Sequence, residues 1–224
     1  MAQSVLVKEL RQIVGDANVL NTPVHLQLYQ YDAYLEERRP DAVVFVHSTE
    51  EVAGIIKVCN AHGTPFVPRG GGTNLSGGTI PFKGGVVIEM IRMNQLLEVD
   101  QKSLRARVQP GMFNLELGNA LAPLGYQFLP DPASQKAATL GGNVAENSGG
   151  PHCFKYGVTT NHVEGLTVVL PDGEIVPFEP AEAVMAKVLI ANFALMVWLA
   201  ATLLKLYGDV FPAYAPSTKM LSIW

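Results

Sequence analysis

The sequence has few charged residues, few cysteines and no cluster of positive charge. Charged side chains make up 16% of the 224 residues, below the roughly 25% of an average soluble protein, and the net charge is −4. Because nucleic-acid binding normally needs a basic patch, we expect no nucleic-acid partner. The two cysteines, Cys59 and Cys153, lie far apart. This spacing favours neither a disulfide framework nor a zinc site, so we expect no metal and a reducing, cytoplasmic location.

Two familiar phosphate-binding motifs and a signal peptide are also absent. A dinucleotide fingerprint needs Gly-x-Gly-x-x-Gly, but Leu75 stands where the third glycine belongs after Gly70 and Gly72. A Walker A loop needs Gly-Lys-Ser/Thr, which does not occur in the sequence. The N-terminal segment MAQSVLVKELRQIVGD carries charges within an amphipathic helical pattern, so it does not resemble a signal peptide.

Hydrophobic periodicity predicts alternating strands and helices. A helix is predicted over Ser4–Val14, and a capping box of Ser48 and Glu51 begins a second one that ends near Gly63. The turn Pro171-Asp172-Gly173 predicts a hairpin. Residues 130–157 are rich in Pro, Gly and Asn and are predicted as a long irregular loop, which is usually functional. The remaining predicted elements are strands at 42–46, 64–67, 86–90, 104–108, 163–170 and 174–176, and a helix around 113–124.

A glycine-rich loop, PRGGGTNLSGG, follows the predicted β-α-β unit. Five glycines fall within residues 70–78. Glycine lets backbone N–H groups approach a diphosphate closely and lets φ become positive, while Arg69, Thr73, Asn74 and Ser76 add side-chain donors. The alternative is a flexible surface loop or tight hairpin, which glycine count alone does not exclude.

A second group of small, amide and hydroxyl side chains lies about sixty residues later, in PDPAS, TLGGNVAENSGG and KYG. Such a lining lets the backbone approach a flat polar ring system and hydrogen-bond its edge. Ordered glycine pairs cost backbone entropy, so two such clusters in one chain call for a reason. A single large ligand spanning both clusters is the most economical explanation.

These motifs, with VQPG at Val108–Gly111 and KYGVT, resemble the FAD-linked oxidases of the vanillyl-alcohol-oxidase type, in the glycolate oxidase and D-lactate dehydrogenase branch. The likeness covers roughly residues 25–177. It implies an α+β, two-lobed FAD-binding domain of the PCMH type at about 1–180. A small β-α-β lobe would lie at about 40–100 and a larger mixed α/β lobe at about 101–180.

The resemblance also implies the cofactor and its contacts. Relatives that attach flavin through a histidine in the first loop have it at the position of Thr73, so FAD is expected to bind non-covalently. The implied reaction is oxidation of a 2-hydroxy acid, of the glycolate or D-lactate type, by hydride transfer to flavin N5. The implied cofactor-binding residues are Pro68, Arg69, Gly70, Gly71, Gly72, Thr73, Asn74, Ser76, Gly77, Gly78, Pro130, Asp131, Pro132, Ser134, Thr139, Gly141, Gly142, Asn143, Asn147, Gly149 and Gly150.

After about residue 180 the sequence departs from the family pattern. Neither the glycine-containing segment that completes the FAD site nor the substrate domain of relatives is recognised, so no catalytic residue can be assigned. We expect 181–224 to be a divergent apolar tail. Residues 188–204 carry no charge, which allows membrane association, since a spanning helix needs roughly 17–25 apolar residues. The alternatives are a helix covering a sheet face and a poorly ordered tail.

Three functional hypotheses follow. In the first, the chain is the FAD-binding part of an enzyme whose hydroxy-acid substrate is bound by a missing domain or another subunit, and an electron-acceptor partner reoxidises the flavin. In the second, it is a truncated module that binds FAD without turnover. In the third, it is a non-functional fragment.

Overall fold

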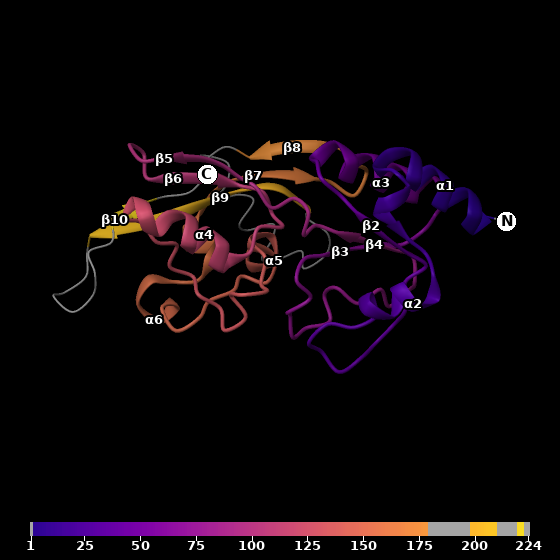
Figure 1. The fold of residues 1–224 in the computed structure, drawn as a ribbon, viewed down its shortest axis with the longest axis horizontal. Coiled ribbons are helices and arrows are strands. Elements are labelled where there is room, and N and C mark those ends of the chain that lie inside the picture. The colour runs from indigo at the N-terminus through magenta and orange to yellow at the C-terminus, as the bar shows by residue number, and fades with distance from the viewer. Residues whose placement is uncertain (1, 179–197, 210–218, 222–224) are drawn as a thin grey trace.

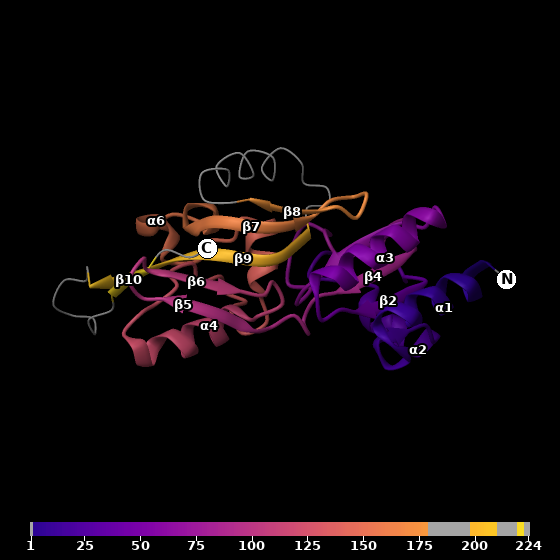
Figure 2. The same cartoon turned by 90° about the horizontal axis from the view of Figure 1, so that it is seen from above.

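The computed structural model describes residues 2–178, 198–209 and 219–221. Its strands form two sheets that lie side by side along the long axis of the molecule (Figure 1). The first has the strand order β1-β2-β4-β3, and the second has the order β5-β6-β9-β7-β8, with β10 paired to β9. The view from above separates the same two lobes (Figure 2). This arrangement confirms the α+β, two-lobed fold class.

The first lobe is a small, mostly parallel sheet flanked by helices. Strand β4 pairs in parallel with both β2 and β3, and β1 adds an antiparallel edge. Its elements, in chain order, are α1 (Ala2–Val14), η1 (Asp16–Asn18), β1 (Val19–Leu20), α2 (Pro23–Leu26), η2 (Gln27–Tyr29), β2 (Ala42–Phe45), α3 (Thr49–Ala61), β3 (Phe66–Arg69) and β4 (Val86–Glu89).

Strand β2 is an uninterrupted apolar run because both faces of the sheet are covered. Val44 and Ile88 belong to the core on the side of α1 and α3, whereas Val43 and Val87 belong to the core that includes Leu26 of α2. A strand buried on both faces needs apolar residues at every position, which is typical of parallel sheets.

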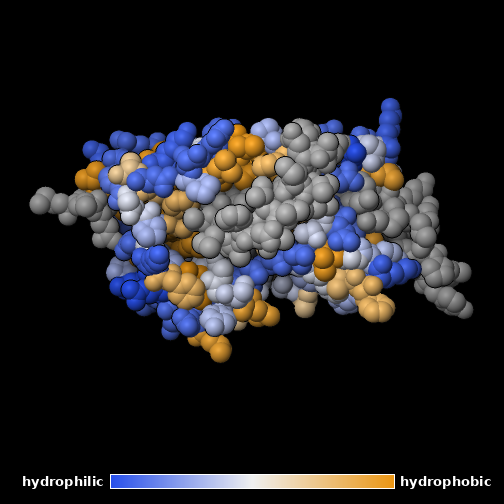
Figure 3. Space-filling view, turned by 180° about the vertical axis from the view of Figure 1, so that it is seen from behind, coloured by the Kyte–Doolittle hydropathy of each residue, from blue (hydrophilic) through white to orange (hydrophobic). Residues whose placement is uncertain are grey.

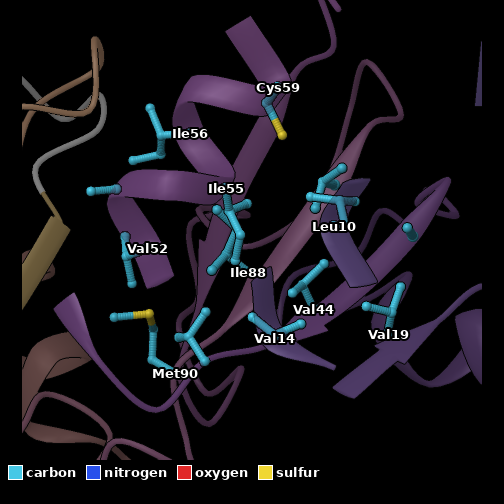
Figure 4. Close-up of a cluster of buried hydrophobic side chains, with 14 of the residues drawn as sticks. Leu10, Val14, Val19, Val44, Val52, Ile55, Ile56, Cys59, Ile88 and Met90 are labelled. Carbon is cyan, nitrogen blue, oxygen red and sulfur yellow. The ribbon is translucent and has the colours of Figure 1, made fainter. Parts of the chain in front are cut away.

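Helix α3 begins and ends where the sequence predicts. The Ser48 hydroxyl accepts a hydrogen bond from the Glu51 backbone N–H at 3.2 Å. In a capping box the Glu51 carboxylate would accept from the Ser48 N–H. Here it accepts from the N–H of the preceding residue, His47, at 2.7 Å. Gly63 follows the helix with φ of +58°. The buried face carries Val52, Ile55, Ile56 and Cys59, which pack toward Leu10, Val14 and the sheet (Figure 4).

The second lobe is an antiparallel sheet covered by helices. Its core includes Val108 of β6, Leu117 and Leu121 of α4, Leu140 of α5 and Val168 of β7. Its elements, in chain order, are β5 (Leu96–Asp100), β6 (Arg105–Val108), α4 (Asn114–Leu121), η3 (Ala122–Leu124), α5 (Leu140–Ala145), α6 (Cys153–Tyr156), η4 (Thr159–His162), β7 (Val163–Val169), β8 (Ile175–Phe178), β9 (Trp198–Asp209) and β10 (Lys219–Leu221).

Two local expectations need correction. The stretch 130–157 is not a continuous irregular loop, because α5 and α6 form within it. Thr139 caps α5 by accepting from the Gly142 N–H at 3.2 Å, so the small residues after it begin a short helix. Strand β5 was not predicted, because its sequence LLEVD has no clean alternation.

Strand β9 lies between β6 and β7 and is antiparallel to both. Of the apolar stretch 188–204, residues 188–197 lie outside the described residues, and residues 198–204 begin β9. A helix over 188–204, one of the alternatives considered for this stretch, is therefore excluded for residues 198–204. No helix in the described part of the chain is long and apolar enough to cross a membrane. The expected end of the FAD-binding domain near residue 180 stays a prediction. Strand β9, which follows residue 180 in the sequence, is part of the second sheet.

The lobes touch at several points. The turn between β7 and β8 reaches α3, where the Asn60 side-chain amide donates to the Pro171 carbonyl at 2.7 Å. The expected small lobe began near residue 40, whereas α1 and β1 already pack with the first sheet and β5 belongs to the second.

On the face seen from behind, apolar side chains are exposed in separate groups among hydrophilic ones (Figure 3).

Candidate cofactor-binding cleft

A cavity of about 330 Å³ lies where the two lobes meet. Strand β3 ends at Arg69, and its loop leaves the carboxyl edge of the parallel sheet, where ligands of such sheets commonly bind. The other wall comes from α5 and the segments on either side of it. The lining residues are Pro68, Arg69, Gly70, Gly71, Gly72, Thr73, Asn74, Leu75, Gly78, Thr79, Met90, Pro110, Ser134, Ala138, Thr139, Gly141, Gly142, Asn143, Ala145, Glu146 and Ser148.

The structure brings both glycine clusters to this one cavity, although it does not place every predicted site residue in the wall. Predicted residues that line the cavity are Pro68, Arg69, Gly70, Gly71, Gly72, Thr73, Asn74, Gly78, Ser134, Thr139, Gly141, Gly142 and Asn143. Predicted residues outside the lining are Ser76, Gly77, Pro130, Asp131, Pro132, Asn147, Gly149 and Gly150. The cofactor contacts of all of them stay a prediction.

Several lining residues were missed by sequence reasoning. Pro110 belongs to the VQPG motif, so that motif was the signal that could have found it. Glu146 and Ser148 lie inside TLGGNVAENSGG but were not among the predicted cofactor-binding residues; Glu146 was expected either to shape the electrostatic field of the flavin or to make structural hydrogen bonds. Nothing in the sequence pattern marks Met90, which follows β4 at the same sheet edge as the glycine loop.

The backbone of the glycine loop is free to bind a ligand. None of the N–H groups from Gly70 to Leu75 donates a hydrogen bond to any described residue, and all six residues line the cavity. Gly72 has φ of +63°, which a residue with a side chain rarely adopts. Consecutive free N–H groups in such a turn form a concave site for anions.

The side chains of the loop are used differently from what we predicted. The Arg69 guanidinium points into the first lobe, where Nη1 donates to the Tyr31 carbonyl at 2.7 Å and lies 3.3 Å from Thr79 Oγ1. The side-chain Oδ1 of Asn74 accepts from the Gly78 N–H at 3.0 Å, which folds the loop on itself. Arg69 and Asn74 therefore shape the loop, and the donors left for a ligand are mainly backbone N–H groups.

Arg69 is paired with Glu89 beneath the loop. Their Nε and Oε2 atoms are 3.7 Å apart, and Glu89 is only 2% exposed. Burial raises the pKa of the Glu89 carboxyl to about 8, and the neighbouring Arg69 charge lowers it in part. The charge on Arg69 is thus held inside the first lobe and does not project into the cavity wall as a free cation.

The glycine loop packs directly on the second lobe. A Cβ atom on Gly71 would lie 1.8 Å from the Ala137 carbonyl oxygen, and one on Gly70 would lie 2.1 Å from Thr139 Oγ1. Both distances are far shorter than a van der Waals contact, so side chains here would force the lobes apart. These two glycines are therefore required by the packing between the lobes, and their role is not limited to ligand approach.

On the opposite wall, Asn143 of α5 is 1% exposed, and its Nδ2 amide has no hydrogen-bond partner among the described residues. Asn143 also lines the cavity. A buried donor without a partner costs about 1–3 kcal/mol. An acceptor supplied by a ligand would remove that cost.

Two predicted residues outside the cavity lining, Asp131 and Asn147, make hydrogen bonds that hold the turns beside α5. Asp131 accepts from the His152 backbone N–H at 3.1 Å, and its other carboxylate oxygen lies 2.6 Å from His152 Nδ1. The Asn147 side chain accepts from the Thr160 N–H at 3.0 Å, with the backbone of Asn147 at φ of +50°. These contacts fix the turns on both sides of α5.

Comparison with known proteins agrees with this two-lobed, glycine-lined architecture. A family model described as FAD binding domain matches residues 40–179. The chain therefore belongs to this family of FAD-binding domains, and FAD is its cofactor. Non-covalent binding of FAD is consistent with this family and with threonine at position 73, which cannot form a histidyl link to flavin.

Relatives and solved structures support the family. Glycolate oxidase subunit GlcD of Bacillus subtilis is 44% identical over 170 residues, which cover 75% of this chain and 36% of that protein. D-lactate dehydrogenase of Anaerostipes hadrus is 43% identical, with 62% of this chain and 29% of that protein covered. An alkyldihydroxyacetonephosphate synthase structure superposes with a TM-score of 0.81 at 25% identity, over 91% of this chain and 43% of that one. The chain thus spans about a third of the length of the curated relatives it matches.

The cavity walls fit FAD on observations of this chain alone. The run of free N–H groups from Gly70 to Leu75 suits a diphosphate, and the unpartnered Asn143 amide offers a buried donor to a polar ring edge. Glycines keep side chains out of much of the space between.

We predict that Gly71→Ala destabilises the protein without added cofactor, by about 1–3 kcal/mol, because the new methyl group meets the Ala137 carbonyl. The matched control is Gly118→Ala on α4, where a Cβ has nothing within 4 Å and should stabilise the helix by up to ~1 kcal/mol. Urea denaturation of both variants measures the difference. Equal stabilities would show that the lobes do not pack as described.

A second prediction concerns pH. Because the folded-state pKa of Glu89 is raised, its contribution to stability is fully present below the unfolded value of 4.5 and is lost as pH rises toward about 8. Glu89→Gln cannot titrate. The melting temperature of the natural protein should therefore fall relative to that of the variant between pH 5 and pH 8.5. If the melting temperatures of the two proteins instead change with pH by the same amount over this range, Glu89 does not titrate there.

Proposed function

We propose that this chain is the FAD-binding part of a flavin-dependent oxidoreductase that oxidises a 2-hydroxy acid of the glycolate or D-lactate type. Support comes from its relatives, which include a glycolate oxidase subunit at 44% identity and a D-lactate dehydrogenase at 43% identity. The observation that carries the proposal is the cavity itself, which combines free loop N–H groups with the unpartnered Asn143 amide.

The residues of this chain divide the work of holding FAD. The N–H groups of Gly70 to Leu75 would donate to the diphosphate, since they have no other acceptor among the described residues. The Asn143 amide would donate to the polar edge of the flavin ring from the opposite wall. The tight packing of Gly70 and Gly71 keeps the two walls at a fixed separation. When bound, FAD would supply the two-electron oxidation of the substrate.

Substrate recognition is proposed to lie outside the matched segment. Arg69 is the only cation in the described cavity wall, and its guanidinium is turned into the first lobe by hydrogen bonds to the Tyr31 carbonyl and Thr79, so it is not placed to clamp a carboxylate. A further domain or another subunit would bind the hydroxy acid, and an electron-acceptor partner would reoxidise the flavin.

A module that binds FAD without turnover is the second candidate. The observation that favours it is the described cavity lining, which offers donors for FAD while its one cation, Arg69, is turned into the first lobe.

We predict opposite effects of Asn143→Leu on stability and on cofactor binding. Leucine has the same branched shape, although it is larger, and it removes a buried donor that has no partner, so the free protein should be as stable as the natural one or more stable. FAD affinity should fall by about tenfold or more because a buried hydrogen bond to the ligand is lost. Flavin fluorescence titration and thermal melting measure the two effects.

Asn119→Leu on the exposed side of α4 is the control and should leave FAD affinity unchanged. Retention of full FAD affinity by Asn143→Leu would show that this amide does not face the cofactor. A natural protein that stays colourless after addition of FAD and desalting would overturn the proposed function.

Turnover separates the two candidates. With FAD bound, this chain alone should reduce a dye acceptor with D-lactate or glycolate only slowly or not at all. Addition of a polypeptide that supplies the substrate-binding part should raise the rate by orders of magnitude. The result that contradicts an enzymatic role is tight FAD binding with no dye reduction under either condition.

A further inference from the structure

Glu146 is the only acidic residue that lines the described cavity, and Arg69 is the only basic one. The Arg69 guanidinium is turned into the first lobe, where it contacts the Tyr31 carbonyl, Thr79 and Glu89. The carboxylate of Glu146 therefore faces the cavity that, under the proposed function, receives a diphosphate.

Glu146 also holds the glycine loop directly. Ser76 Oγ donates to the Glu146 carboxylate, whose oxygens lie 3.1 and 2.9 Å away. The same carboxylate lies against Gly78, because a Cβ there would be 3.0 Å from Oε1. Ser76 belongs to the loop of the first lobe, and Glu146 ends α5 in the second, so this contact crosses the cleft.

A carboxylate and a phosphate compete for the same kind of donor. A serine hydroxyl has one proton to donate and can serve only one of them at a time. Two anions close to one loop also repel each other, by about 1 kcal/mol for unit charges 4 Å apart in water. Both effects oppose simultaneous occupation of the loop by Glu146 and a diphosphate.

We propose that the Ser76–Glu146 contact is a latch that joins the two walls of the cleft before FAD binds, and that Glu146 sets the rate and affinity with which the glycine loop takes up the diphosphate of FAD. FAD entry breaks the latch, and the Ser76 hydroxyl passes from the carboxylate to a phosphate oxygen. This inference rests on the proposed function, since it needs FAD in this cavity.

The test uses the cofactor-free protein and FAD in stopped-flow fluorescence. Glu146→Gln keeps an acceptor for Ser76 but removes the charge, so the association rate and affinity should rise about three- to tenfold at low salt. The gain should shrink in 0.5 M NaCl, where charges are screened. Glu98→Gln makes the same charge change at an exposed position of β5 and should have no effect.

A double variant tests the contact itself. In a Ser76→Ala background the carboxylate is no longer held at the loop, so Glu146→Gln should give a smaller gain than it does alone. Equal melting temperatures of the variants would show that folding does not cause the differences.

The outcomes are separable. If Glu146→Gln binds FAD no more tightly than the natural protein, the latch is overturned and the proposed function still stands. Binding weaker than that of the natural protein would place the Glu146 carboxylate among the contacts of bound FAD. A natural protein that takes up no FAD overturns the proposed function and the latch together.

Discussion

The close packing of the glycine loop on the second lobe is the constraint on which the cleft depends. Gly70 and Gly71 lie against Thr139 and the Ala137 carbonyl, with no room for a side chain at either position. This contact fixes how far the loop N–H groups stand from the amide of Asn143. A binding site divided between two lobes needs such a spacer, because neither wall can position the other through its own sheet.

Much of the fold could be predicted from local signals. The Ser48 cap, the buried run of β2 and the turn at Asp172 each act through nearby residues, so their patterns are visible in the sequence. The division into two glycine clusters also predicted the two walls of the cavity. These features follow from backbone propensity and burial, which a single sequence records.

The remaining features depend on contacts between residues far apart in the chain. Arg69 was predicted to donate to a ligand, but it lies beside Glu89 of the neighbouring strand β4. This contact depends on the register of two strands about twenty residues apart, which the sequence does not indicate. Asp131 contacts His152, a pairing that no motif in the sequence indicates, and its expected contact with the cofactor stays a prediction. Ser76 and Glu146 meet only because the lobes meet. Polar residues in a glycine-rich motif therefore indicate the place of a site more securely than their individual roles.

The central position of β9 has a consequence for the order in which the protein assembles. Its register pairs Lys205 with Arg105 and Leu204 with Val163, so the second sheet closes through contacts between residues up to about a hundred positions apart. The first lobe is built from neighbouring segments between α1 and β4. During synthesis it can fold as soon as β4 emerges, whereas β6 and β7 keep unpaired edges until β9 arrives. This interval is when the chain is most exposed to aggregation and most dependent on chaperones.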